Sequence, residues 1–572
     1  MHRIFQVHDI VHLIVKQLVP PTTCTSIYAG AGDLARVARV QKAIGDVALD
    51  VLWESVGFEA IPHLFGSDVV DVDDVGKMQF FVNWPTPKCL DRFRLYAPRI
   101  RTVQRPYTEK YIDILNVLQF LSALSRLSPT PLFPSLRSIR WFSAEISELP
   151  FLHTLFNPDL TSFLLTLAHI PSRSLQVGDA VSHSFPASFL ESPLKALVER
   201  NVCLKELWVP SPGLEVGAGS EITTISLSFE APCLSLIDHS PYLTHISIIP
   251  TPSILVALSH LSSLKWLILN VRPILPTSPS HDSETPQPLP THRFPSLETI
   301  TAHTPTLASL NSILNIVQKP DGLLITPKYR ISVDAHDAPT PAEITSFIDL
   351  ILPPSGSPTL ESFRIFSSSR TRITINPNEP NSSITLLTLT PVLLCPQLVH
   401  FEINAGFPLS LTDSNLVTLA RSWPNMSNLV LGSETESMGL GFLESERGIT
   451  LEGLETLAQM ERLRYLTVIV RVSDISTPVT TPQFEHGEMD FSSAQVEEKS
   501  KCSLRVLSVG STRMHTSWVS NVTKFLGRCF PNLEFVSSVR CVSGEEGREA
   551  WRAVERGLRA EREAKREQQV NH

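Results

Sequence analysis

The chain has 572 residues, of which 42% are hydrophobic and 18% charged, and its formal net charge is −9. A negative balance without an unmatched basic run argues against nucleic acid as the main partner, because phosphate binding needs a concentrated basic face. No stretch of about 18 apolar residues occurs in the sequence, so we expect no membrane span. The 45 prolines exceed an average share of about 5% and predict many turns.

The eight cysteines are spread so widely that no C-x-x-C pair exists, which excludes the spacing expected of a zinc site or a redox pair. They fit reduced structural thiols, and we expect a cytoplasmic or nuclear protein. Polar residues interrupt the first apolar stretch, so we expect no secretory signal peptide. These residues are His8, Asp9, His12 and Lys16.

The first predicted element is an amphipathic helix within residues 4–18, which ends before Pro20-Pro21. Its apolar residues recur at steps of three and four and form one face: Val7, Ile10, Val11, Ile14 and Leu18.

A second helix is predicted to begin after Asp33, whose side chain can cap its first turn. Two or three short helices give a very small core, so a module of this size needs a partner or a flanking domain to bury its apolar faces. The apolar residues of this part are Leu34, Val37, Ala38 and Val40, followed by Ala48, Leu49, Leu52 and Trp53.

One short pattern recurs along most of the chain: an apolar residue, two variable residues, an apolar residue, one variable residue and usually another apolar one. This L-x-x-L-x-L step is typical of leucine-rich repeats, and its last two apolar positions lie on one face of a short strand. The copies are Leu136-Ile139-Trp141, Leu160-Phe163-Leu165, Leu204-Leu207-Val209, Leu243-Ile246-Ile248, Leu264-Leu267-Leu269, Leu297-Ile300-Ala302, Leu360-Phe363-Ile365, Leu398-Phe401-Ile403, Met426-Leu429-Leu431, Leu463-Leu466-Val468, Leu504-Leu507-Val509 and a degraded Leu533-Val536.

Helical patterns lie between many of these copies, for example in residues 252–261, 305–317 and 413–423. Helix-then-strand units with right-handed crossovers stack into a curved array with a parallel sheet on its concave side. The long interval between Leu297 and Leu360 predicts a hidden unit with a strand in residues 328–335. A set of ordinary α/β units is the alternative. Several copies have a proline two residues before their first leucine, where we expect it to start the extended segment: Pro134, Pro158, Pro295, Pro358, Pro396, Pro424 and Pro531.

The N-terminal stretch resembles an F-box, whose pattern is an apolar first helix, an Asp-Leu pair, a second helix and a terminal Leu-Trp. Here the pairs are Asp33-Leu34 and Leu52-Trp53, while the family's opening Leu-Pro is Val7-His8 and its Cys after the second-helix Val is Gln41. The resemblance implies docking onto the Skp-type linker subunit of a cullin-RING (SCF-type) ubiquitin ligase. The residues that it assigns to this contact are Ile10, Ile14, Leu18, Leu34, Val37, Val40 and Trp53.

Further strings are similar to the F-box plus leucine-rich-repeat proteins abundant in mushroom-forming (basidiomycete) fungi. They are ALDVLW at 48–53, LDRFRLYAPRIRTV at 90–103, PLFPSLRSIRW at 131–141 and ELPFLHTLFNPDLTSFLL at 148–165. The resemblance implies an α/β fold with a small N-terminal helical F-box-like module followed by a curved leucine-rich-repeat-like solenoid, and it leaves the target protein open.

We therefore predict four parts: the F-box-like module (1–60), a connecting region with a first irregular repeat (61–130), the solenoid (131–541) and a charged C-terminal helix (542–572). Trp551, Val554 and Leu558 form a narrow stripe, as expected of a terminal capping helix, with a partner-binding helix as the alternative. Polar insertions interrupt the solenoid at 271–293 and 473–501, and loops of this length are regulatory candidates. Their candidate phosphoacceptors are Ser278, Thr477 and Thr481.

No nucleotide-binding, metalloprotease or nucleophile-elbow motif is present, so we predict a chain that is not an enzyme and has no catalytic, cofactor or metal site. His8 and His12 are four residues apart, but no third metal ligand is recognisable near them. Two functions remain: an adaptor that brings a target protein to a ubiquitin ligase, and an interaction scaffold whose N-terminal helices only cap the repeats. An apolar face of Ile10, Ile14, Leu34, Val37 and Val40 that is free would favour the adaptor.

Overall fold

A computed structural model of the chain describes most residues from His8 to Val570. The ranges are 8–18, 31–40, 42–65, 69–72, 79–81, 86–105, 113–167, 188–209, 229–271, 294–317, 329–352, 357–367, 383–404, 409–432, 448–472, 502–510, 512, 514–538 and 544–570. Several predictions fall outside these ranges: those on Val7 and Gln41, and those on the insertions at 272–293 and 473–501 with their phosphoacceptors.

The chain divides into two compact units. The first comprises residues up to Asn270 with Phe294–Ser296, and the second comprises residues 271–293 and 297–572. No helix in the described ranges is long and apolar enough to cross a membrane.

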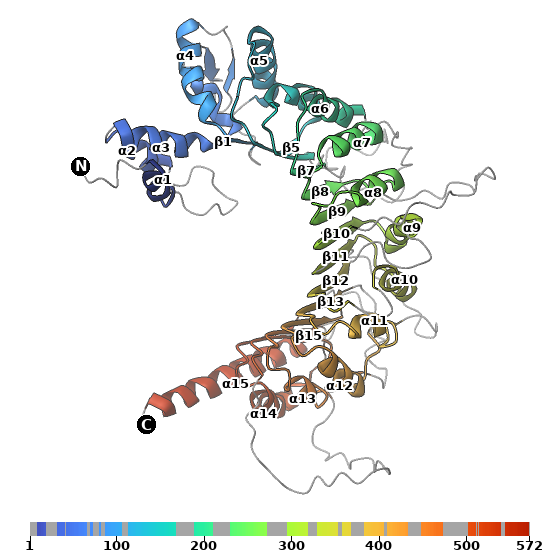
Figure 1. Cartoon of the computed structure of the whole chain (residues 1–572). Helices are drawn as coiled ribbons and strands as arrows, with labels where there is room; N and C mark the ends of the chain where they lie inside the picture. Colours follow the sequence, from blue (N-terminus) through green and yellow to red (C-terminus); the bar gives the residue numbers. More distant parts are fainter. Residues whose placement is uncertain are drawn as a thin grey trace, which may run out of the picture. The chain divides into compact units, whose positions relative to one another are not determined.

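The first unit begins with three helices and continues with alternating helices and strands (Figure 1). Its α-helices are α1 His8–Lys16, α2 Ala31–Val37, α3 Lys42–Glu54, α4 Pro87–Tyr96, α5 Ile114–Leu127, α6 Ser188–Glu199, α7 Glu230–His239 and α8 Pro252–Ser259. Its strands are β1 Ser55–Gly57, β2 Val70–Val72, β3 Gln79–Phe81, β4 Thr102–Arg105, β5 Ser138–Ala144, β6 Ser162–Leu167, β7 Glu206–Trp208, β8 His245–Ile248 and β9 Trp266–Asn270. Its 3₁₀ helices include η4 Ala97–Arg99 and η5 Ile146–Leu155.

The second unit repeats the alternation, and Figure 1 shows α9 and α10 on one side of its strands. Its strands are β10 Thr299–Thr304, β11 Arg330–Ala335, β12 Ser362–Ser367, β13 His400–Asn404, β14 Asn428–Leu431, β15 Tyr465–Val468, β16 Val506–Ser508 and β17 Phe535–Ser537. Its α-helices are α9 Leu307–Val317, α10 Pro341–Ile351, α11 Thr390–Leu393, α12 Asp413–Ser422, α13 Leu454–Leu457, α14 Val519–Cys529 and α15 Gly544–Val570, with the 3₁₀ helix η9 at Thr516–Trp518.

Apart from β2 and β3, which pair antiparallel in a sheet of their own, the strands form the parallel α/β architecture that the repeated step predicts. In the first unit they follow the order β1-β4-β5-β6-β7-β8-β9, and in the second they run from β10 to β17. Within each unit, the second apolar residue of one repeat strand lies opposite that of the neighbouring repeat strand, as with Ile139 and Phe163, or Phe363 and Phe401. These positions are buried, and each fully buried side chain of this size stabilises the fold by roughly 1.5–3 kcal/mol. The hidden strand predicted in 328–335 is present as β11.

The structure corrects the expected role of the prolines. Each of the seven lies in a tight turn just before the strand and is not the first residue of the extended segment. At Pro134, for example, the amide of Leu136 donates to the carbonyl of Phe133 at 3.2 Å, so proline occupies the second position of the turn. Its fixed φ suits that position.

Side-chain caps fix the start of several helices. Asp113 accepts a hydrogen bond from the amide of Asn116 at 2.9 Å at the start of α5. Thr340 and Glu343 form a reciprocal capping box on α10, with Pro341 in its first turn. Each such cap contributes about 1 kcal/mol.

Candidate docking site

The three N-terminal helices enclose a small core of their own. Its buried members are Val11, Val15, Leu34, Val47, Ala48 and Val51, and Val37, Ala38, Ile44 and Leu52 pack against it. Helix α3 contributes half of these side chains and contacts both α1 and α2.

Helix α1 has apolar side chains on two sides. Val11 and Val15, four residues apart, are each only 3% exposed and face this core. On the other side Leu13 is 63% exposed and Ile14 49%. We call the exposed set the α1 stripe: Ile10, Leu13, Ile14 and, in the turn after the helix, Leu18.

Helix α2 differs from its predicted start. It begins at Ala31, so Asp33 lies within its first turn instead of at the N-cap, and there it forms an ion pair with Arg36 at 3.1 Å. An acidic side chain in the first turn still interacts favourably with the helix dipole. Leu34 points into the three-helix core, Val37 is half-buried against it, and Val40 is 74% exposed in the turn that follows.

Helix α3 is held against the first repeat by charge and by ring packing. Arg99 forms ion pairs with Asp50 and, at 3.6 Å, with Asp46. The ring of Trp53 packs on Tyr96 of α4 with 5.0 Å between the ring centroids. The helix then runs directly into β1, whose residues pair with β4.

The seven residues assigned to the dock therefore lie in three environments. Ile10, Ile14 and Leu18 are together on the α1 stripe, and Val40 is also exposed. Leu34 and Val37 belong to the three-helix core, and Trp53 belongs to the joint with the repeats. Leu13 was not among the predicted contact residues, although it is three residues after Ile10 and thus on the same side of the helix. Because α1 is apolar on both sides, periodicity could not separate its outer from its inner face.

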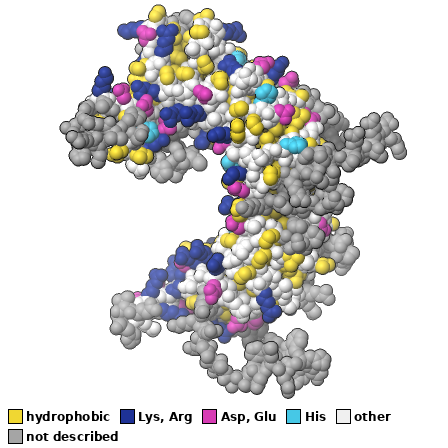
Figure 2. Space-filling model, in the orientation of Figure 1, with side chains coloured by type: hydrophobic (Ala, Val, Ile, Leu, Met, Phe, Trp, Pro, Cys, Tyr) yellow, Lys and Arg dark blue, Asp and Glu magenta, His cyan; other side chains and the backbone are white. Residues whose placement is uncertain are grey.

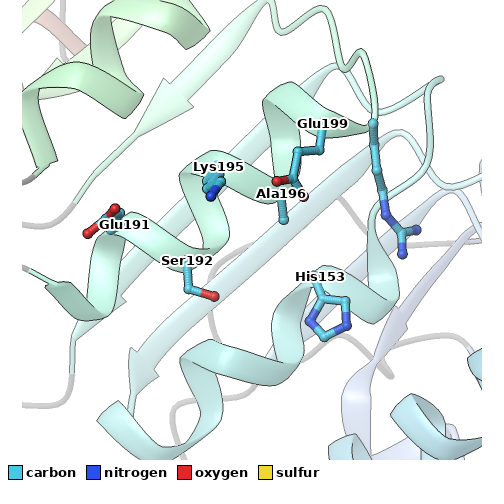
Figure 3. A pocket seen from close by; sticks show the side chains of 7 residues that line it. His153, Glu191, Ser192, Lys195, Ala196 and Glu199 are labelled. Atoms are coloured by element: carbon cyan, nitrogen blue, oxygen red, sulfur yellow. The ribbon is translucent and has the colours of Figure 1, made fainter.

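A polar cleft of about 520 Å³ lies in the first unit between η5 and α6 (Figure 3). Glu191 and Glu199 lie towards opposite ends of its α6 wall, and His153 lies across from them on η5. His153 is hydrogen-bonded to the carbonyl of Pro150 at 2.7 Å, and Arg200 donates to the carbonyl of Phe156. No hydrogen bond joins two of the described side chains that line the cleft.

Within the described ranges, no group of three or more His, Cys, Asp or Glu side chains is placed to hold a metal ion. Of the two histidines on α1, His12 interacts with other groups of the chain, and the side chain of His8 is not among those that the structure describes.

No protein-family model matches the sequence, and no curated protein matches it. Among solved structures, the chain is similar to the crystal structure of the Rad7 and Elc1 complex in yeast, at 13% sequence identity and a TM-score of 0.32. The match covers 76% of this chain and 91% of the other.

Proposed function

We propose that the chain is a non-enzymatic substrate-recognition adaptor of an SCF-type (cullin-RING) ubiquitin ligase, acting in the cytoplasm or nucleus. In this proposal the N-terminal module is an F-box that docks onto the Skp-type linker subunit, and the repeats bind a target protein. Neither nucleic acid nor a membrane is a partner.

The α1 stripe is the observation that carries the proposal. The inner side of α1 already fills the three-helix core through Val11 and Val15, so the outer side chains do not serve that core. Contiguous exposed apolar side chains on one helix are typical of protein-binding sites. Burying Leu13 and Ile14 against a partner would stabilise the complex by roughly 1.5–3 kcal/mol for each side chain.

One observation favours the scaffold instead. The contacts of Arg99 with Asp46 and Asp50, and of Trp53 with Tyr96, place α3 on the first repeat in the manner of a terminal cap. Such a cap would need no exposed stripe on α1, which is why we rank the adaptor first.

Co-purification of the full chain with a Skp-type linker subunit tests the proposal. We expect a one-to-one complex, and Ile14→Asp should weaken binding roughly thirtyfold or more because it places a charge in the centre of an apolar contact. Leu13→Asp should act in the same way. Leu34→Asp is unsuitable as a test, because Leu34 is only 3% exposed and the change would disrupt the module itself.

Leu127→Asp is the matched control, because Leu127 is 69% exposed at the end of α5 and receives the same substitution. It should leave linker binding unchanged. A folded wild-type chain that does not bind the linker would remove the adaptor proposal and leave the scaffold. Equal losses in the control and the stripe variants would show that the stripe is not the contact.

A further inference from the structure

The solvent side of strands β6–β9 carries a group of large side chains. In the parallel register Leu164 lies opposite Trp208, and His245 lies opposite Trp266. Trp266 is 40% exposed and the others are half-buried. We call this group the aromatic face: Leu164, Trp208, His245, Trp266 and Ile268.

The two tryptophans of the aromatic face have unused hydrogen-bonding capacity. No described residue accepts a hydrogen bond from the indole N–H of Trp208 or of Trp266, whereas the indoles of Trp141, Trp423 and Trp551 each have an acceptor. The ring of Trp266 is steadied by His245, with 5.2 Å between the centroids. Exposed, positioned tryptophans that offer a ring and an N–H donor are typical of the energetic centre of a protein-binding site.

Three cations lie beside the aromatic face. Arg140 lies opposite Leu164 in the register. Arg137 and Lys205 each precede a strand, and their backbone amides bond to the preceding repeat. All three are exposed, and Figure 2 shows Lys and Arg side chains over the β1–β5 part of this unit.

Two carboxylates lie near the same strands. Glu206 on β7 accepts a hydrogen bond from the hydroxyl of Ser162 at 2.8 Å, and Asp159 is exposed in the turn before β6. Among the described residues, three cations against two carboxylates leave this surface positive, although the chain as a whole carries −9. Charge complementarity therefore favours an acidic occupant.

We propose that the aromatic face and its three flanking cations dock an acidic segment of a partner protein that carries a large apolar side chain. The apolar side chain packs on Trp208 and Trp266, and neighbouring carboxylates meet Arg137, Arg140 and Lys205. The inference rests on the proposed function in taking the repeats as the part that captures a target. Neighbouring strands are about 4.8 Å apart, so the cations are spread over several strands, and Glu206 lies among them. A nucleic-acid site would need a denser basic surface without a carboxylate.

A displayed library of random short peptides, panned on the immobilised full chain without any linker subunit, tests the inference. We expect enrichment of peptides that combine Asp or Glu with Trp, Phe or Leu. On the Trp266→Ala chain the enrichment should fall about tenfold or more, as for loss of a central aromatic contact. On an Arg140→Glu, Lys205→Glu chain the selected peptides should turn basic.

Two variants serve as matched controls and should select the same acidic peptides as the wild type. Phe535→Ala removes a 52% exposed aromatic ring at the corresponding strand position of the second unit. Lys195→Glu reverses an exposed charge on α6 of the same unit. Circular dichroism would verify that every variant folds.

The inference is overturned if no acidic peptides are enriched, if Trp266→Ala and Phe535→Ala select alike, or if an oligouridylate binds the wild-type chain and displaces the peptides. The Ile14→Asp chain separates this result from the proposed function. Retained peptide selection in that variant supports the docking surface even where linker binding fails.

Discussion

Arg105 and Glu148 form an ion pair inside the first unit, with 2.8 Å between Nη2 and Oε1 and with side chains only 1% and 3% exposed. The other carboxylate oxygen accepts a hydrogen bond from the indole of Trp141 at 2.7 Å. Arg105 lies opposite Trp141 in the register, so it stands where other repeats place an apolar side chain. A buried charge of this kind depends on its partner, because an unpaired one costs several kcal/mol.

This pair makes stability depend on pH. Burial raises the pKa of Glu148 from 4.5 to about 7, against the opposing Arg105 charge and Trp141 hydrogen bond. Between these values the folded chain holds a proton that the unfolded chain has released, so the free energy of unfolding falls as pH rises through about 7. The loss is about 3 kcal/mol in total. Urea unfolding followed by circular dichroism should show a lower midpoint at about pH 8 than at about pH 5.5.

Glu148→Gln is the control for this dependence. Glutamine resembles the protonated side chain in shape and charge. In this variant the free energy of unfolding should therefore lose most of its dependence on pH between about pH 5.5 and pH 8. Glu148→Ala should instead lower stability by about 3–5 kcal/mol, because it leaves Arg105 without a counter-charge. A wild-type chain that gains stability as pH rises, or a Gln variant with an unchanged pH profile, would contradict the assignment.

Arg105 is also the reason that the strand containing it could not be predicted from the sequence. The step Ile100-Val103-Arg105 ends on a charge where the pattern requires an apolar residue, and only Glu148, 43 residues later, makes that acceptable. The strand β1 was also not predicted, because its two buried apolar residues, Val56 and Phe58, directly follow α3. The later strands were predictable because a local rule fixes them: two apolar positions in alternation, each facing the next copy.

In the N-terminal module, by contrast, the helices could be predicted but the side chains that face the core could not. Its helices follow from apolar periodicity, but Val15 and Ile14 are equally apolar neighbours, and only the packing of α3 decides that Val15 is inside. The face of the β6–β9 sheet was likewise hidden, because Trp208 and Trp266 occupy variable positions of the step and become neighbours of other side chains only through the parallel register.

The two sides of α1 should therefore respond differently to the same substitution. Val15→Asp would bury a carboxylate at a 3% exposed position and should unfold the three-helix module, at a cost of several kcal/mol. Ile14→Asp, at 49% exposure, should change stability by less than about 1 kcal/mol. Hydrogen exchange of peptides from α1 and α3 would measure this, and equal loss of protection in both variants would contradict the assignment of the two faces.

At the other end of the chain, α15 should stabilise the last repeats through Trp551. This side chain is 1% exposed, and its indole donates to the carbonyl of Thr512 at 3.1 Å. Trp551→Ala leaves a large cavity and should cost about 3–5 kcal/mol, whereas Trp551→Phe should cost less because it keeps most of the bulk. Arg566→Ala, in the exposed last part of the helix, is the control. The urea midpoint measures all three, and an unchanged midpoint for Trp551→Ala would show that α15 does not stabilise this end.

In the second unit, the backbone of Gly453 lies against the side chain of Asp413. Asp413 accepts hydrogen bonds from the amide and the hydroxyl of Thr450, both at 2.8 Å, and a Cβ on Gly453 would overlap its carboxylate. The backbone of Gly453 has φ −56° and ψ −27°, which any residue adopts. Gly453→Ala should thus destabilise the chain by about 1–3 kcal/mol solely by displacing Asp413 from Thr450.

A double-mutant cycle isolates that cause. Asp413→Ala alone should cost a similar amount, since it removes the same hydrogen bonds to Thr450. In the Asp413→Ala background, Gly453→Ala should be neutral or slightly stabilising, because alanine has less conformational freedom than glycine in the unfolded chain. Urea midpoints of the four proteins give the coupling energy. If Gly453→Ala costs the same in both backgrounds, the carboxylate is not what requires glycine at this position, and the start of α13 must be limited by its backbone instead.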